Sequence, residues 1–131
     1  MANTALGDGR TFVDVTTNKT VALTDSGTVQ NVTATGVTIT LLATIAGASY
    51  TIRNGGLAPT GAAVGAASGA AVTVTIAPNA SDQIAGLGFT ATDAKSVINT
   101  LGNVGDEIKL VADATNGWVI QEAKGTWTRQ A

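Results

Sequence analysis

Hydrophobic and polar residues alternate with a period of two along most of the chain, and Gly, Asn and Asp residues interrupt this alternation at short intervals. In the segment AVTVTIAP, Val72, Val74 and Ile76 share one face and the threonines share the other. Pro78 ends that strand because proline cannot donate a hydrogen bond to a sheet ladder. Such densities of β-branched residues favour strands over helix. The pattern predicts an all-β fold, a single-domain β-sandwich or jelly roll of roughly 8–10 short antiparallel strands.

Three segments fall outside this alternation. The stretch TATDAKSVINTLG has the start and stop signals of a helix, so at most one short helix is expected, near residues 93–101. Residues 55–71 are rich in Ala and Gly and are too long for a tight hairpin, which predicts a long loop. Residues 1–10 are expected to form a flexible N-terminal arm, and residues 11–131 a single β-sandwich domain.

The last third of the chain predicts a β-hairpin, since DEIKLVAD and WVIQEA flank the turn signal Asn116–Gly117. The preferred register is the one that places the hydrophobic residues of both strands on one face, because a slip of one residue exchanges the two faces of a strand. A three-residue loop, with Gly117 in the left-handed bulge position, places Trp118 and Ile120 on one apolar face with Ile108, Leu110 and Ala112. A two-residue loop places them opposite Lys109, Val111 and Asp113, so the three-residue loop is preferred.

Both tryptophans of this aromatic-poor chain lie in its last fourteen residues. A tight return at Lys124–Gly125 would bring Trp127 onto the same face as Trp118, so both rings are expected to seal one end of a sheet core. The alternative is an exposed platform for carbohydrate, for which Tyr50 and Arg129 would be the only additional side chains. Burial in the core or at a subunit interface is the preferred interpretation.

The residue counts exclude several function classes. The 131 residues contain no Cys and no His, which removes thiolate chemistry, the commonest general base and the commonest transition-metal ligand. The net charge of −2 and the 12% of charged residues provide no basic stripe for nucleic acid. The weakly apolar run GAAVGAASGAAV is too short to span a membrane. MANTALGDGR lacks the basic and apolar regions of a secretory signal.

The charged side chains do not form a recognisable catalytic or metal-binding pattern. Asp106 and Glu107 are adjacent, so on a strand they point to opposite faces and cannot act together on one substrate. Basic residues are expected to be solvated or paired across strands, for example Lys109 near Glu122. The sequence therefore predicts a protein that is not an enzyme and that has no cofactor or metal.

The carboxy-terminal segment NVGDEIKLVADATNGWVIQEAKGTW resembles a segment that recurs in virion proteins of tailed bacteriophages, and the upstream run ending in YTIRNGG resembles their first strands. The resemblance covers residues 20–54 and 104–127. Its motif positions are occupied by Gly105, Asp106, Leu110, Asn116, Gly117, Trp118, Gly125 and Trp127. These are residues that build a fold, so they bear on architecture more than on function.

This resemblance implies a capsid decoration, or cement, protein of small β-jelly-roll type. Such a protein is made in the host cytoplasm and forms a homotrimer on the exterior of the phage capsid. It binds the major capsid protein and stabilises the junctions between capsomers. The N-terminal arm is the expected capsid contact, through Asn3, Thr4, Leu6, Asp8 and Arg10. The alternative function is a carbohydrate- or receptor-binding module of a phage head or tail fibre.

Overall fold

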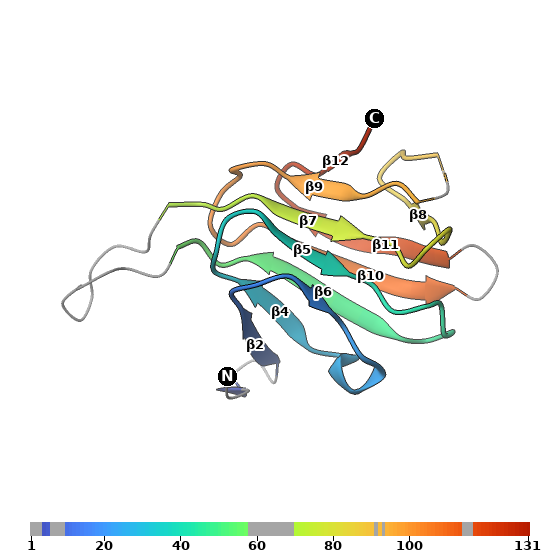
Figure 1. Cartoon of the computed structure of the whole chain (residues 1–131), viewed down its shortest axis with the longest axis horizontal. Helices are drawn as coiled ribbons and strands as arrows, with labels where there is room; N and C mark the ends of the chain where they lie inside the picture. Colours follow the sequence, from blue (N-terminus) through green and yellow to red (C-terminus); the bar gives the residue numbers. More distant parts are fainter. Residues whose placement is uncertain (1–3, 6–9, 58–69, 91, 93, 114–116) are drawn as a thin grey trace.

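The computed structural model describes residues 4–5, 10–57, 70–90, 92, 94–113 and 117–131. Within these residues the chain is all-β, as predicted. Two mixed sheets pack face to face as a β-sandwich (Figure 1), and the single short helical element in the described ranges is the 3-10 turn η1 (Leu23–Asp25).

The larger sheet has seven strands in the order β1-β2-β4-β6-β10-β11-β8. Their bounds are Thr4–Ala5 (β1), Thr11–Val15 (β2), Val29–Val32 (β4), Ser49–Asn54 (β6), Glu107–Asp113 (β10), Gly117–Lys124 (β11) and Ile84–Ala85 (β8). The smaller sheet has five strands in the order β12-β9-β7-β5-β3. Their bounds are Thr128–Arg129 (β12), Val97–Asn99 (β9), Val74–Ala77 (β7), Val37–Thr40 (β5) and Lys19–Thr20 (β3). Strands β1, β3, β8 and β12 have two residues each, too few to give a periodic signal, so the described strands exceed the predicted number.

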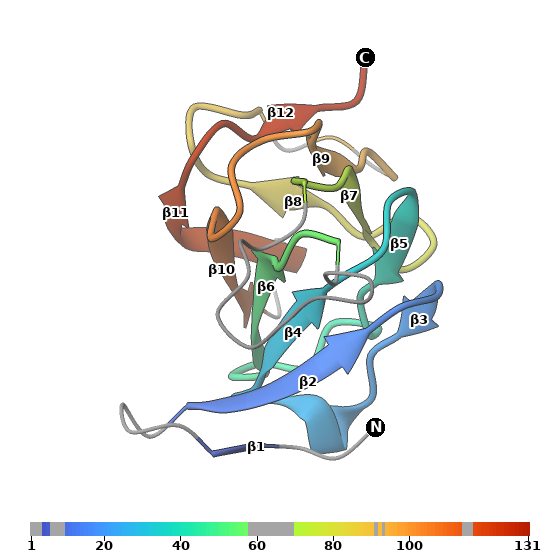
Figure 2. The same ribbon diagram turned by 90° about the vertical axis from the view of Figure 1, so that its left-hand side faces the viewer.

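Successive strands from β2 to β10 alternate between the two sheets (Figure 2). As a result β2, β4 and β6 run parallel to one another in the larger sheet, and β3, β5 and β7 run parallel in the smaller one. The prediction of an antiparallel sandwich is therefore wrong for this half of the molecule. Antiparallel pairing holds where β10 joins β6 and β11, and where β9 joins β7 and β12. A period-two pattern marks the inner face of a strand but does not specify its neighbour or direction.

The helix expected near residues 93–101 is also wrong in the described residues, because Val97–Asn99 forms strand β9. Ala94 has a φ of 58°, outside the right-handed helical region. Val97 and Asn99 are fully buried and Ile98 faces outward, so the short segment follows the strand period after all. Pairing with β7 outweighs the weak local helix signal.

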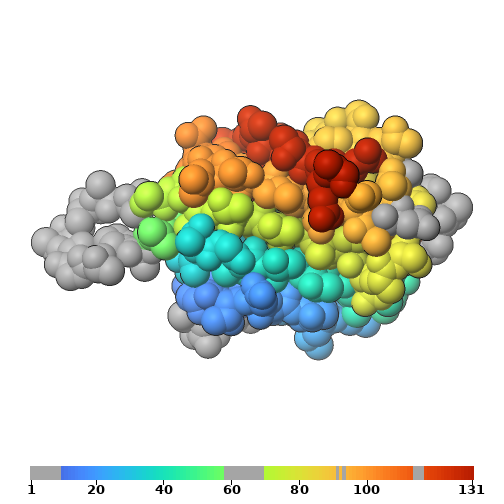
Figure 3. Space-filling view, turned by 45° about the horizontal axis from the view of Figure 1, so that its top comes forward, coloured from blue at the N-terminus to red at the C-terminus, as the bar shows by residue number. Residues whose placement is uncertain are grey.

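The core lies between the sheets and consists mainly of Val, Ile and Leu side chains around three rings. Trp118 is fully buried and Trp127 is 6% exposed. The rings of Tyr50 and Trp118 have centroids 5.5 Å apart in a tilted arrangement. The indole N–H groups donate to backbone carbonyls, that of Trp118 to Leu42 at 3.2 Å and that of Trp127 to Lys124 at 3.0 Å. After Trp127 the chain crosses to the smaller sheet, where its C-terminal residues lie against the β9 region (Figure 3).

The hairpin of β10 and β11 has the predicted register, in which the hydrophobic residues of both strands share one face. Ala112 lies opposite Trp118, Leu110 lies opposite Ile120, and Gly117 has a φ of 91°. A β-carbon on Gly117 would stand 2.6 Å from the carbonyl oxygen of Gln83, the residue before β8, so this close approach also requires glycine there. Asn116 lies outside the described residues.

A bulge shifts the register between Lys109 and Leu110. Ile108 therefore lies opposite Ala123, and Lys109 lies opposite Glu122 as the sequence predicts. Ile108 remains fully buried in the core.

Candidate functional site

The predicted core residues of the segment that carries the sequence resemblance lie inside the fold, whereas its motif residue Gly125 is exposed. Ile108, Leu110, Trp118, Ile120 and Trp127 are all buried members of the core. The two tryptophans do not form an exposed aromatic platform, because neither indole is presented to solvent. These residues therefore serve the architecture and form no binding surface.

A buried polar network at one end of the sandwich contains the motif residue Asp106. Oδ2 of Asp106 accepts hydrogen bonds from the side-chain amide of Asn99 at 3.1 Å and from the backbone N–H of Asn103 at 2.9 Å. Asn54 donates in turn to Oδ1 of Asn99 at 2.7 Å. Asn54 lies in β6 and Asn99 in β9, so the network joins the two sheets. Its side chains are satisfied by one another and by the backbone, which makes it a structural element.

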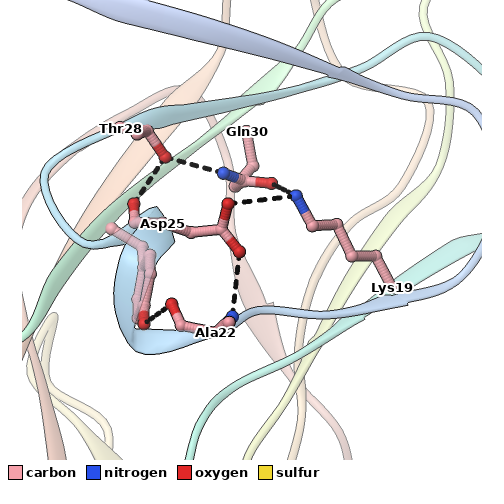
Figure 4. Close-up of polar contacts among 6 residues, drawn as sticks. Lys19, Ala22, Asp25, Thr28 and Gln30 are labelled. Carbon is pink, nitrogen blue, oxygen red and sulfur yellow. Dashed lines mark hydrogen bonds and ion pairs between the residues drawn. The ribbon is translucent and has the colours of Figure 1, made fainter. Parts of the chain in front are cut away.

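A second polar network joins the sheets near η1 (Figure 4). Lys19 of β3 donates from Nζ to Oε1 of the fully buried Gln30 of β4 at 2.7 Å, and lies 3.5 Å from a carboxylate oxygen of Asp25. The other oxygen of Asp25 accepts from the backbone N–H of Ala22 at 2.9 Å. The hydroxyl of Tyr50 donates to the carbonyl of Ala22 at 2.7 Å. Burial raises the pKa of the Tyr50 phenol, and the negative charge of Asp25 raises it further.

The N-terminal residues expected to touch a capsid are only partly described. Thr4 lies in β1, where it pairs with Phe12 of β2. The guanidinium of Arg10 donates to both carboxylate oxygens of Glu107 at 3.2 Å, so Arg10 is bound to the middle of the larger sheet. Asn3, Leu6 and Asp8 lie outside the described residues.

The outer face of β10 and β11 carries charged side chains at one end and apolar side chains at the other. Its charged end contains a hollow of about 260 Å³, referred to below as the charged hollow. The charged hollow is lined by Arg10, Thr51, Glu107, Lys109, Glu122, Ala123 and Lys124. In the ladder, Lys109 lies between Thr51 and Glu122. In the neighbouring row Glu107 lies between Arg53 and Lys124, so cations and carboxylates alternate across β6, β10 and β11 there.

Cations gather at this end of the face although the whole chain is acidic. Arg53 and Arg10 both lie over the ring of Phe12, at 5.6 and 5.3 Å from its centroid. Nη2 of Arg53 and Nζ of Lys124 both approach Gly105, within 3.8 and 3.9 Å of where a β-carbon would stand. With Lys109, the region holds four of the seven Lys and Arg residues of a chain whose net charge is −2.

The other end of the same face is apolar. An open hollow of about 590 Å³, the apolar hollow, is lined by Ala46, Val111, Ala112, Asp113, Val119 and Gln121. Val111 lies opposite Val119 in the ladder, and the β-bulge lies between this pair and the pair Lys109–Glu122. The bulge places the consecutive residues Gln121 and Glu122 in the apolar and charged hollows respectively, so the two hollows adjoin.

Sequence reasoning did not identify this face as a candidate site. The pairing of Lys109 with Glu122 was the available signal, and it was interpreted as ordinary cross-strand pairing. What the sequence could not show is that β6 lies beside β10 and that Arg10 reaches Glu107 from a segment 97 positions away. Both depend on the topology of the larger sheet.

Within the described residues, no helix is long and apolar enough to cross a membrane, and no three acidic side chains are grouped so that they could hold a metal ion. Comparisons of the chain with protein-family models, with curated proteins and with solved structures found no match.

Proposed function

We propose that this chain is a structural protein of a tailed-bacteriophage virion, of the capsid decoration class. In this proposal it binds the major capsid protein on the exterior of the head as a homotrimer and stabilises capsomer junctions. The resemblance of residues 104–127 to phage virion proteins is the observation that carries the proposal. The fold supports it in that the inward-facing residues of β10 and β11 belong to the core, while the outer face of the same two strands is available for contact.

Several modest contacts per oligomer would provide the adhesion. A trimer that touches neighbouring capsomers gains from effective concentration, so weak individual contacts add to a stable attachment. The glycan-binding alternative depended on exposed tryptophans, and both indoles are buried. Carbohydrate binding is therefore the less favoured function for this chain.

Imaging of decorated capsids tests the proposal. Capsids assembled from the major capsid protein of the same genome would be mixed with the purified protein and imaged by electron microscopy. We expect added density at ordered positions on the outer surface. Light scattering on the free protein is expected to give three times the chain mass of 13.0 kDa. Capsids that remain bare at micromolar protein would refute the proposed function.

A further inference from the structure

We propose that the outer face of β10 and β11 binds an extended polypeptide segment of a partner protein, in which a carboxylate side chain stands two positions from an aliphatic one. The carboxylate would occupy the charged hollow and the aliphatic side chain the apolar hollow. The inference identifies the contact surface of the proposed virion protein and to that extent rests on the proposed function. The binding chemistry itself can be tested without a capsid.

The spacing of the two hollows matches the repeat of an extended peptide. Lys109 and Val111 are successive outward-facing residues of β10, and they line the charged and the apolar hollow respectively. Residues two apart on a strand are separated by roughly 7 Å. A ligand in extended conformation repeats its own side chains with the same spacing. A carboxylate and an aliphatic group at positions i and i+2 can therefore meet Lys109 and Val111 together.

The charges in the charged hollow favour an anionic group. Glu107 is bound by Arg10 through both of its oxygens, so a cation already balances its charge. Among the described residues, neither Lys109 nor Lys124 has an ion-pair partner within 4.0 Å. Glu122, which lies opposite Lys109 in the ladder, offsets one of these two ammonium groups, so the charged hollow keeps one net positive charge that attracts a carboxylate.

A polypeptide fits this face better than a glycan does. The apolar hollow presents the aliphatic side chains of Val111 and Val119, which match an aliphatic side chain of a peptide. Sugar rings stack on exposed aromatic faces, and no aromatic residue in the described part of the chain lines either hollow. An acidic glycan would use the cations and leave the apolar hollow empty.

Binding of synthetic peptides tests the proposal directly. The probe is an eight-residue peptide in which glutamate and leucine alternate at every second position, separated by serine. We expect it to shift the methyl resonances of Val111 and Val119 in NMR spectra, and to bind more weakly as the salt concentration rises. A peptide with lysine in place of glutamate is expected to leave these resonances unchanged. Equal binding of both peptides would overturn the proposal, as would binding of oligogalacturonate in preference to the glutamate peptide.

Variants of the two hollows separate their contributions. Replacing Lys109 and Lys124 together by glutamine is expected to raise the Kd for the peptide about tenfold at low salt, as two exposed ion pairs are lost. The double variant Val111→Thr and Val119→Thr keeps β-branched side chains and should also weaken binding. Lys95→Gln is the matched control, because Lys95 lies outside both hollows and bonds the carbonyl of Ala131. Unchanged affinity in both double variants would overturn the proposal.

The capsid experiment distinguishes this inference from the proposed function. If wild-type protein decorates capsids and the lysine double variant decorates them equally well, the contact surface is wrong while the function stands. If wild-type protein leaves capsids bare but binds the glutamate peptide, the proposed function fails while the peptide site stands.

Discussion

Gly125 lies directly against the carboxylate of Asp106, so closely that a β-carbon on this glycine would overlap with the carboxylate carbon and both of its oxygens. The two residues are 19 positions apart, and both belong to the segment that resembles phage virion proteins. Asp106 in turn holds Asn99 and the backbone of Asn103. The contact between Gly125 and Asp106 therefore explains their spacing in the motif. Only glycine at position 125 allows the chain to pass this close to the buried polar network.

Gly125→Ala is expected to lower the free energy of unfolding by more than about 2 kcal/mol, since the φ of 91° is unfavourable for alanine and the methyl group would displace Asp106. Gly27→Ala is the matched control. Gly27 has a similar φ of 85° but open space around its β-carbon position, so only the backbone cost applies, about 1–2 kcal/mol. Urea denaturation of both variants measures the difference. Equal losses would show that the contact with Asp106 contributes nothing.

Whether the sequence could predict a feature of this fold depended on how far apart in the sequence the interacting residues lie. The alternation of side chains identified strands, buried faces and the register of the last hairpin, because each of these is set by residues close in sequence. The parallel winding of β2, β4 and β6 could not be predicted, because inner-face periodicity is the same for either strand direction. The proposed contact surface could not be predicted either, because it is formed in part by the ion pair of Arg10 with Glu107, two residues far apart in the sequence.

Tyr50 is expected to make stability depend on pH in the alkaline range. Its pKa is raised in the folded protein, first by burial and then by Asp25, so the unfolded chain loses the phenolic proton at a lower pH than the folded chain. The stabilisation is complete below the ordinary pKa of 10.0 and is lost as pH rises towards the folded value. Because the chain contains a single tyrosine, ultraviolet absorbance of tyrosinate measures this titration directly.

Tyr50→Phe provides the control for that titration. The variant lacks the hydrogen bond from the phenol to the carbonyl of Ala22, which is expected to lower the free energy of unfolding by about 1 kcal/mol near neutral pH. Above pH 10 the difference in unfolding free energy between wild type and variant should shrink, since only the wild type has the phenol. A difference that stays constant between pH 8 and pH 11 would contradict the assigned environment of Tyr50.

Lys19 is expected to stabilise the fold through Gln30, to which it donates from β3 of the opposite sheet. Lys19→Met keeps the long aliphatic stem but removes the donor, which leaves the buried Oε1 of Gln30 unsatisfied. The expected cost is about 1–3 kcal/mol. Lys95→Met, at a partly exposed lysine whose one hydrogen bond among the described residues is to the carbonyl of Ala131, should change stability by less than about 0.5 kcal/mol.

A double-mutant cycle with Gln30→Leu isolates this interaction. If the Lys19–Gln30 pair is the cause, Lys19→Met should cost much less in the Gln30→Leu background, because the acceptor is then absent. Thermal unfolding of the four proteins gives the coupling energy. Additive effects would mean that Lys19 acts through Asp25 alone.

Trp118 is expected to be the more critical of the two indoles for stability. It is fully buried, packs against Tyr50, and donates to the carbonyl of Leu42, so Trp118→Phe removes both core volume and a hydrogen bond. A loss of about 2–4 kcal/mol follows from the cavity and the orphaned carbonyl together. Trp127 donates to Lys124 only three residues away and retains 6% exposure, so Trp127→Phe should cost less.

Fluorescence provides an independent check, because both indoles should emit at short wavelength and resist quenching by acrylamide. Strong quenching of either single-tryptophan variant would place that ring at the surface and restore an aromatic platform as a candidate binding site.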